Sequence, residues 1–222
     1  MSVSAFRAPN PVATREPSRK TPIVRTVPPL GAWARLRAFL GRLQEWGLPR
    51  GHRRRIRQSR RVLRTLRPGL ADPQGAPRVF GYLRKIDPLT FEELVLESFR
   101  RMGYPIRRNR RYTGDGGVDG RVKIARLWMP IQCKRYTQSL SPAHVEDFGA
   151  LVSQTGWRSR GQGFFIHTGR TGPLSRQTVR IAQGQIVMVS GDRLITLLRG
   201  DRSAVGEWVL SARDRLRGSR RS

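Results

Sequence analysis

The periodicity of the apolar residues changes along this chain and confines a folded core to residues 79–200. A helix is expected after Asp87-Pro88, because this pair offers helix-start chemistry before the segment FEELVLESFRRM. The apolar positions of that segment recur at helical spacing, and Gly103 ends it. The compact part of the chain is therefore expected to begin near Phe80.

Short apolar or alternating segments after this helix predict a sheet. Three strands are expected over residues 104–108, 118–126 and 128–135, with an open boundary between the last two because residues 125–127 have weak turn chemistry. The elements that follow are a helix from residue 141, a strand over 163–168, a helix over 174–183, a strand over 185–190 and a helix after residue 192. This alternation predicts an α/β fold with helices on both faces of the sheet.

The rest of the chain is expected to lie outside that domain. Residues 1–30, rich in Pro, Ser, Thr and Arg, are expected to be a disordered basic tail. Residues 31–78 are expected to form a basic amphipathic helical arm that ends in a Pro/Gly linker over 68–78. Residues 201–222 are interpreted as a basic tail with one further helical turn.

The charge of the chain restricts its partners. The formal net charge is +29, with 40 Arg and only 4 Lys. Such a field attracts polyanions, and DNA or RNA gains affinity because neutralised phosphates release counterions. An acidic membrane surface is the rival partner, and inflation of Arg by base-rich codons is the third explanation. Nucleic acid is the partner that the composition favours.

Cysteine content and hydropathy bear on the compartment. Cys133 is the one cysteine, so the chain has no internal disulfide and no cysteine-based zinc site. No apolar run has the length of a signal-peptide core or of a membrane-spanning helix. We expect a bacterial cytoplasmic protein that associates with the nucleoid through its charge.

Two polar motifs in neighbouring strands carry the chemistry. In IQCKRY, Gln132 and Lys134 share one face of a strand, while Ile131 and Cys133 face the core. In GDGGVDG, Asp119 begins the preceding strand, and a hairpin centred near residue 126 would place it opposite residues 132–134. A carboxylate with a neutral oxygen suits Mg²⁺, and a lysine can orient or deprotonate a water. The alternatives are a solvated strand face and a simple Gly/Asp turn, in which Asp115 organises the loop.

The segments FEELVLESFRRMGY, GDGGVDG, IQCKRY and FFIHTGR, in this order, resemble the Mrr-type restriction endonuclease family, a branch of the PD-(D/E)xK nuclease superfamily. The resemblance covers about residues 88–199. It implies an αβββαβ core with a mixed sheet and Mg²⁺- or Mn²⁺-dependent hydrolysis of phosphodiester bonds in DNA. It also implies that Asp119, Gln132, Lys134 and the helix residue Glu92 are catalytic, and that Asp119, Gln132 and Glu92 bind the metal. Gln132 stands where most of the superfamily has an acid.

The choice between Glu92 and Glu93 depends on the faces of the predicted helix. Glu92 is in line with Val95 and Phe99 at the edge of the buried face. Glu93 is in line with Glu97 on the face expected to be exposed, and it could close a capping box with the residue three positions before it, Thr90. If Asp87 is the cap, that role disappears. Glu92 is the better site candidate on either interpretation.

Three functions fit these observations: a DNA endonuclease that restricts foreign or modified DNA or acts in repair, a non-enzymatic nucleic-acid-binding protein on a nuclease-like fold, and a membrane-surface protein. No small-molecule cofactor is expected, and a homodimer is plausible because double-strand cutting normally needs two active sites. The three histidines and five tryptophans are interpreted as surface or packing groups. The expected DNA contacts are all arginines: Arg53, Arg54, Arg55, Arg57, Arg60, Arg61, Arg135 and Arg170.

Overall fold

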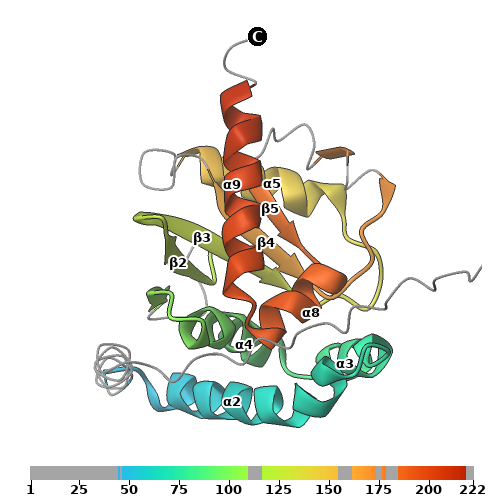
Figure 1. Cartoon of the computed structure of the whole chain (residues 1–222). Helices are drawn as coiled ribbons and strands as arrows, with labels where there is room; N and C mark the ends of the chain where they lie inside the picture. The colour runs from blue at the N-terminus through green and yellow to red at the C-terminus, as the bar shows by residue number, and fades with distance from the viewer. Residues whose placement is uncertain are drawn as a thin grey trace, which may run out of the picture.

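The computed structural model describes residues 45, 47–109, 117–154, 162–173, 177–178 and 185–218 (Figure 1). The part of the expected helical arm before residue 45 lies outside the described residues, as does Asp115. Of the helix expected over 174–183, only residues 177–178 are described. The elements in chain order are α2 (Arg50–Ala71), α3 (Ala76–Leu83), α4 (Pro88–Arg101), β1 (Ile106–Arg108), β2 (Gly120–Ile124), β3 (Leu127–Lys134), α5 (Pro142–Gln154), β4 (Gly163–His167), β5 (Ile186–Val189), α8 (Asp192–Arg199) and α9 (Arg202–Gly218).

The five strands form one mixed sheet in the order β1-β2-β3-β4-β5. The pairs β1/β2 and β2/β3 are antiparallel, whereas β3/β4 and β4/β5 are parallel. The antiparallel half comes from strands that are adjacent in sequence, and the parallel half needs the crossover that α5 provides. The expected α/β fold with helices on both faces of the sheet is confirmed.

The two faces of the sheet are covered unequally. The larger core lies under α4, α8 and α9 and includes Phe99, Ile131 and Phe164, each 0% exposed. On the other face α5 packs on a smaller cluster in which Phe148 meets Phe165 edge to face, with ring centroids 5.6 Å apart. Figure 1 shows α9 in front of β4 and β5, and α5 behind them.

Helix α2 is not a separate arm, contrary to the expectation from sequence. Its apolar residues Val62, Leu63, Leu66 and Leu70 are buried in the larger core, where α2 packs against α4 and α8. These residues recur at helical spacing, so the apolar stripe faces the domain while the arginine clusters face away. The linker is also shorter than the expected 68–78, because α2 continues to residue 71 and α3 begins at residue 76.

The C-terminal segment also differs from the expected tail. Helix α9 has 17 residues, and Val205, Val209 and Ala212 are buried along one side of it. This spacing of four and three residues is an amphipathic stripe, and it packs against β5. None of the described helices is long and apolar enough to cross a membrane.

A two-residue turn fixes the β2–β3 hairpin. Ala125 and Arg126 have φ angles of 47° and 68°, and Ile124 pairs with Leu127. Consecutive left-handed residues make the primed turn that matches strand twist, although Asn-Gly is its usual sequence. The turn was hard to locate from sequence because neither residue is one that this turn favours.

Candidate active site

Asp119 is held at the start of β2 by the neighbouring strand. Its backbone N–H donates to the Ile131 carbonyl oxygen at 2.9 Å, and the Cys133 N–H donates to Asp119 Oδ2 at 2.5 Å. The first bond extends the pairing of β2 with β3 by one residue, to Asp119. The second bond fixes the orientation of the Asp119 carboxylate. The structure therefore brings Asp119 beside residues 131–133, as the hairpin predicted.

Gln132 and Lys134 lie on the face of β3 opposite Ile131 and Cys133, which belong to the larger core. The Gln132 side chain is 8% exposed, and its Oε1 is buried without a hydrogen-bond partner among the described residues. Lys134 is half-buried at the end of the strand. An unsatisfied buried amide oxygen costs free energy, and a bound cation would remove that cost.

Gly117 makes room for the Gln132 amide. A Cβ at Gly117 would lie 2.9 Å from Gln132 Nε2, and the residue has a φ of +83°. Both the close approach and the left-handed backbone require glycine. The glycine-rich motif therefore seals one side of Gln132, which places the motif at the site.

Helix α4 reaches this site through Leu96. A Cβ on Gly120 would lie 2.7 Å from Leu96 Cδ2, so the helix and β2 are in close contact next to Asp119. Glu92 is four residues before Leu96 and shares its side of the helix. Glu92 is half-buried, and its position on α4 directs it toward the edge of the sheet that holds Asp119.

The pKa of the buried Cys133 thiol is affected by the charged side chains near it. Burial is the main cause that raises its pKa well above the ordinary value, and the negative charges of Asp119, Glu92 and Glu93 raise it further. Lys134 opposes this rise. The charges of these three carboxylates and of the Lys134 ammonium therefore act on the middle of β3. The thiol stays protonated, which excludes Cys133 as a nucleophile at neutral pH.

The expectation that Glu93 lies on an exposed face was wrong. Glu93 and Glu97 are each 1% exposed. Arg108 Nε donates to Glu93 at 2.7 Å, and Arg60 Nε donates to Glu97 at 3.1 Å. The reason is tertiary, because α2 and β1 cover the side of α4 that a lone helix would expose.

Asp87 caps α4. Its Oδ2 accepts the backbone N–H of Thr90 at 2.9 Å, so the capping box with Glu93 does not form. Burial by itself raises the pKa of Glu97, but the hydrogen bonds and charges of Arg100 and Arg60 bring it below the ordinary value. These acids are structural, and Glu92 is left as the helix glutamate near the site.

The expected DNA-contacting arginines fall into separate groups. Arg55 pairs with Asp87 at 3.4 Å, Arg60 pairs with Glu45 and Glu97, and Arg135 donates to the Arg84 carbonyl. These three make internal contacts. Four others lie on α2 on the outer side of α4: Arg53, Arg54, Arg57 and Arg61.

Arg170 lines a pocket of about 460 Å³ together with Arg84, Thr137, Gln138 and Ser139. The pocket lies beyond the ends of β3 and β4, since the Thr168 N–H bonds to the Lys134 carbonyl and Ser139 bridges to Arg170. Arg84 is fixed there by two bonds to the Thr168 carbonyl, at 3.2 and 3.1 Å. The sequence analysis did not identify Arg84 or residues 137–139 as site residues. The polar residues 137–139, which follow the strand that ends at Lys134, were the sequence feature that could have indicated this loop.

The histidines carry no chemistry in this arrangement. His167 is 0% exposed at the end of β4, and burial lowers its pKa to about 4, so it is neutral. His144 stacks on Tyr136, with ring centroids 5.8 Å apart. His52, expected on the surface, is buried in α2. In the described part of the chain no three His, Cys, Asp or Glu side chains form a metal cluster.

Comparisons with known proteins identify the family of this chain. A family model described as restriction endonuclease, the Mrr catalytic domain, matches residues 83–198. The Type IV methyl-directed restriction enzyme EcoKMrr of Escherichia coli K12 is 31% identical over 145 residues, which cover 62% of this chain and 44% of the relative. The chain thus spans less than half the length of that relative.

A distant structural likeness also exists. The MspJI restriction endonuclease, solved in complex with a 27-mer oligonucleotide, superposes with a TM-score of 0.39 and 20% identity, covering 63% of this chain and 34% of that one.

Proposed function

Because the chain belongs to the restriction endonuclease family that the Mrr catalytic domain defines, we propose that it is a metal-dependent endonuclease that hydrolyses phosphodiester bonds in foreign or modified DNA. The observation that carries the proposal is the buried Gln132 Oε1, which has no hydrogen-bond partner among the described residues, beside the fixed Asp119 carboxylate on the face that also presents Lys134. An ordinary solvated strand face would not bury an amide oxygen without a partner.

The residues present fit a divalent cation, Mg²⁺ or Mn²⁺. Asp119 and Gln132 would hold it with a carboxylate and a neutral oxygen, and Glu92 would add a second carboxylate from α4. A bound divalent ion polarises a phosphoryl oxygen and lowers the pKa of a water. Since Gln132 carries no charge, the site depends on Glu92 more than a site with a third acid would.

The chain itself positions the groups that act on the phosphate. The Cys133 N–H holds Asp119 in one orientation, and Gly117 confines the Gln132 amide. Lys134 presents an ammonium at the end of the same face, where it can orient the attacking water and stabilise charge on the phosphate. Such preorganised groups need no rearrangement at the moment of reaction.

The basic surfaces have different roles in this proposal. Arg170 and Arg84 line a polar pocket beyond Lys134, which suits a phosphate of the bound DNA next to the scissile one. The exposed arginines of α2 supply long-range attraction. Double-strand cleavage would use a homodimer, and a cytoplasmic location near the nucleoid would bring the chain to its substrate.

The test is plasmid nicking by the purified chain. We expect nicking with Mg²⁺ or Mn²⁺, none with chelator, and recovery after metal is added back. Asp119→Asn keeps the size of the side chain and should bind DNA in Ca²⁺ without nicking it. Full nicking in chelator would refute the metal site. DNA binding without nicking of any substrate by the wild type would favour the non-enzymatic alternative.

A further inference from the structure

The antiparallel half of the sheet has one open face, defined by Arg107, Arg121, Lys123 and Trp128. Arg107 pairs with Arg121, and Lys123 pairs with Trp128. Residues directly opposite in antiparallel strands point to the same side, and side chains alternate along each strand. Trp128 therefore shares its face with Gln132 and Lys134, so the open sheet face lies on the same side of the sheet as the proposed active site, with the buried Pro130 between Trp128 and Gln132.

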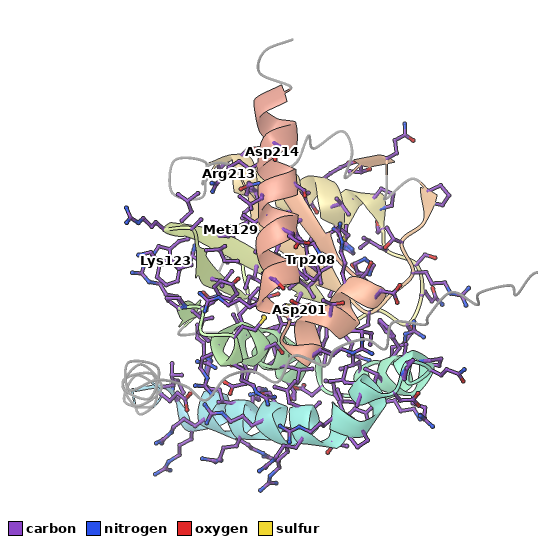
Figure 2. The ribbon with its side chains drawn as sticks, viewed as in Figure 1. Lys123, Met129, Asp201, Trp208, Arg213 and Asp214 are labelled. Carbon is purple, nitrogen blue, oxygen red and sulfur yellow. The ribbon has the colours of Figure 1, made fainter. Side chains whose placement is uncertain are left out.

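In the described part of the chain, no apolar cluster joins a helix to the four residues that define the open sheet face, whereas Pro130 and Gln132 further along β3 are buried. The cluster beneath α5 contains Phe165 and Ile186 from β4 and β5, and in the described part of the chain it includes no residue of β1, β2 or β3. The reverse side of the same strands faces the larger core, where Val122 and Met129 are 0% exposed. Arg107 is exposed, and Lys123 extends outward at the hairpin end of the sheet (Figure 2).

The cations of this face are not neutralised. Within the described residues, Arg107, Arg121 and Lys123 make no ion pair, whereas the ion pairs present join other arginines to buried or exposed carboxylates. Trp128 holds two of them, with the Arg107 guanidinium carbon 4.3 Å and the Lys123 Nζ 5.8 Å from the ring centroid. Cation–π contacts of this kind keep a cation in place without cancelling its charge. Two cations held by Trp128 and the neighbouring Arg121, none of them in an ion pair with a described residue, fit a polyanion.

The spacing also fits a nucleic acid strand that reaches the active site. Gln132 is four residue steps from Trp128 along β3, which is about 13 Å at about 3.3 Å per residue. This distance corresponds to about four base-pair steps along the axis of a DNA duplex, at about 3.4 Å each. Helix α2 packs on α4, which covers the other face of the sheet (Figure 1). The α2 arginines are therefore on the opposite side of the sheet from the open sheet face.

We infer that the open sheet face seats the DNA backbone for cleavage: Arg107, Arg121 and Lys123 bind phosphates, and Trp128 orders Arg107 and Lys123. The inference rests on the proposed nuclease function and extends it by naming the docking surface. It assigns an ordering role to Trp128, which the sequence analysis interpreted as a packing group. It also assigns DNA docking to the strand pair β1 and β2 with Trp128 of β3, and not to the basic helix α2.

The first test compares two variants that lose the same charge. Arg107, Arg121 and Lys123 are replaced by Gln in one variant, and the exposed Arg64, Arg67 and Lys85 are replaced by Gln in the matched control. Binding of a DNA duplex is measured in Ca²⁺ over a range of salt concentrations. Each lost phosphate contact lowers the slope of log K against log salt by about 0.9, so the first variant should lose about 2–3 and the control less than about 0.5.

The outcomes separate the two proposals. Equal changes of slope in both variants would overturn the docking surface, because only net charge would then matter. A wild type that binds no DNA would overturn the proposed function itself. Circular dichroism and thermal unfolding establish that both variants are folded.

The second test concerns the tryptophan alone. Trp128→Leu removes the ring and keeps an apolar side chain, so we expect DNA binding to weaken by about 3–10-fold, the size of a cation–π contribution. Trp128→Phe retains a π face and should recover part of that loss. If Trp128→Leu binds DNA as tightly as the wild type while remaining folded, the ordering role is refuted.

Discussion

Removal of residues 1–74 should unfold the domain, although the sequence suggests a dispensable basic arm. Helix α2 places Val62, Leu63, Leu66 and Leu70 in the larger core, each between 3% and 5% exposed. Burial of one such side chain stabilises a fold by about 1.5–3 kcal/mol, so the four together contribute about 6–12 kcal/mol. The whole stability of a domain is about 5–15 kcal/mol.

The assay is urea denaturation followed by circular dichroism, applied to the full chain, to the truncated chain and to Leu66→Ala. The point variant should lose about 2–5 kcal/mol, as buried leucines do. The truncated chain should show no cooperative transition. Arg61→Gln, on the exposed side of the same helix, is the control and should leave stability within about 0.5 kcal/mol. A truncated chain that unfolds cooperatively with the stability of the full chain would refute the packing argument.

The remaining predictions concern charged groups at and near the site. Lys134→Arg should keep most DNA affinity in Ca²⁺ but reduce nicking by at least about 100-fold, since a guanidinium is bulkier and keeps its proton; wild-type nicking would show that Lys134 is not catalytic. Glu92→Gln should reduce nicking with little change in the free energy of unfolding. Glu93→Gln should lower the free energy of unfolding by about 1–3 kcal/mol, because it weakens the buried bond to Arg108. The reverse pattern would mean that Glu93 is the site residue and Glu92 the structural one. Because Arg100 and Arg60 lower the folded pKa of Glu97, its contribution to stability is complete above the ordinary glutamate pKa and is lost as pH falls through the folded value. Denaturation curves for wild type and Glu97→Gln should therefore converge on acidification, and a constant difference would contradict this linkage.

The sequence predicted β2 and β3, the strands of the proposed site, well because their information is local. Alternation in β3 separates Gln132 and Lys134 from Ile131 and Cys133, and the parity of the hairpin places Asp119 opposite them. Neither inference needs a distant partner. The five strands expected from the described residues are all present, with ends shifted by one or two residues.

The burial of charged residues depended on distant partners and was therefore missed. Acids on a helix are usually solvated, so Glu97 was placed on an exposed face. Its burial requires Arg60, which is 37 residues away in sequence and belongs to a helix that looked like a free arm. The many arginines of α2 also masked the apolar stripe that holds this helix in the core.

The turn at Ala125 and Arg126 has a consequence for how this active site can be lost. A slip of one residue in the pairing of β2 with β3 would move every side chain of one strand to the other face of the sheet. Asp119 would then point toward α4 while Gln132 stayed where it is, and the protein would keep every side chain of the proposed site without the site itself. A one-residue insertion or deletion in this turn that shifts the pairing is therefore as damaging as a substitution at the proposed site. A chain altered in this way would still contain every sequence motif.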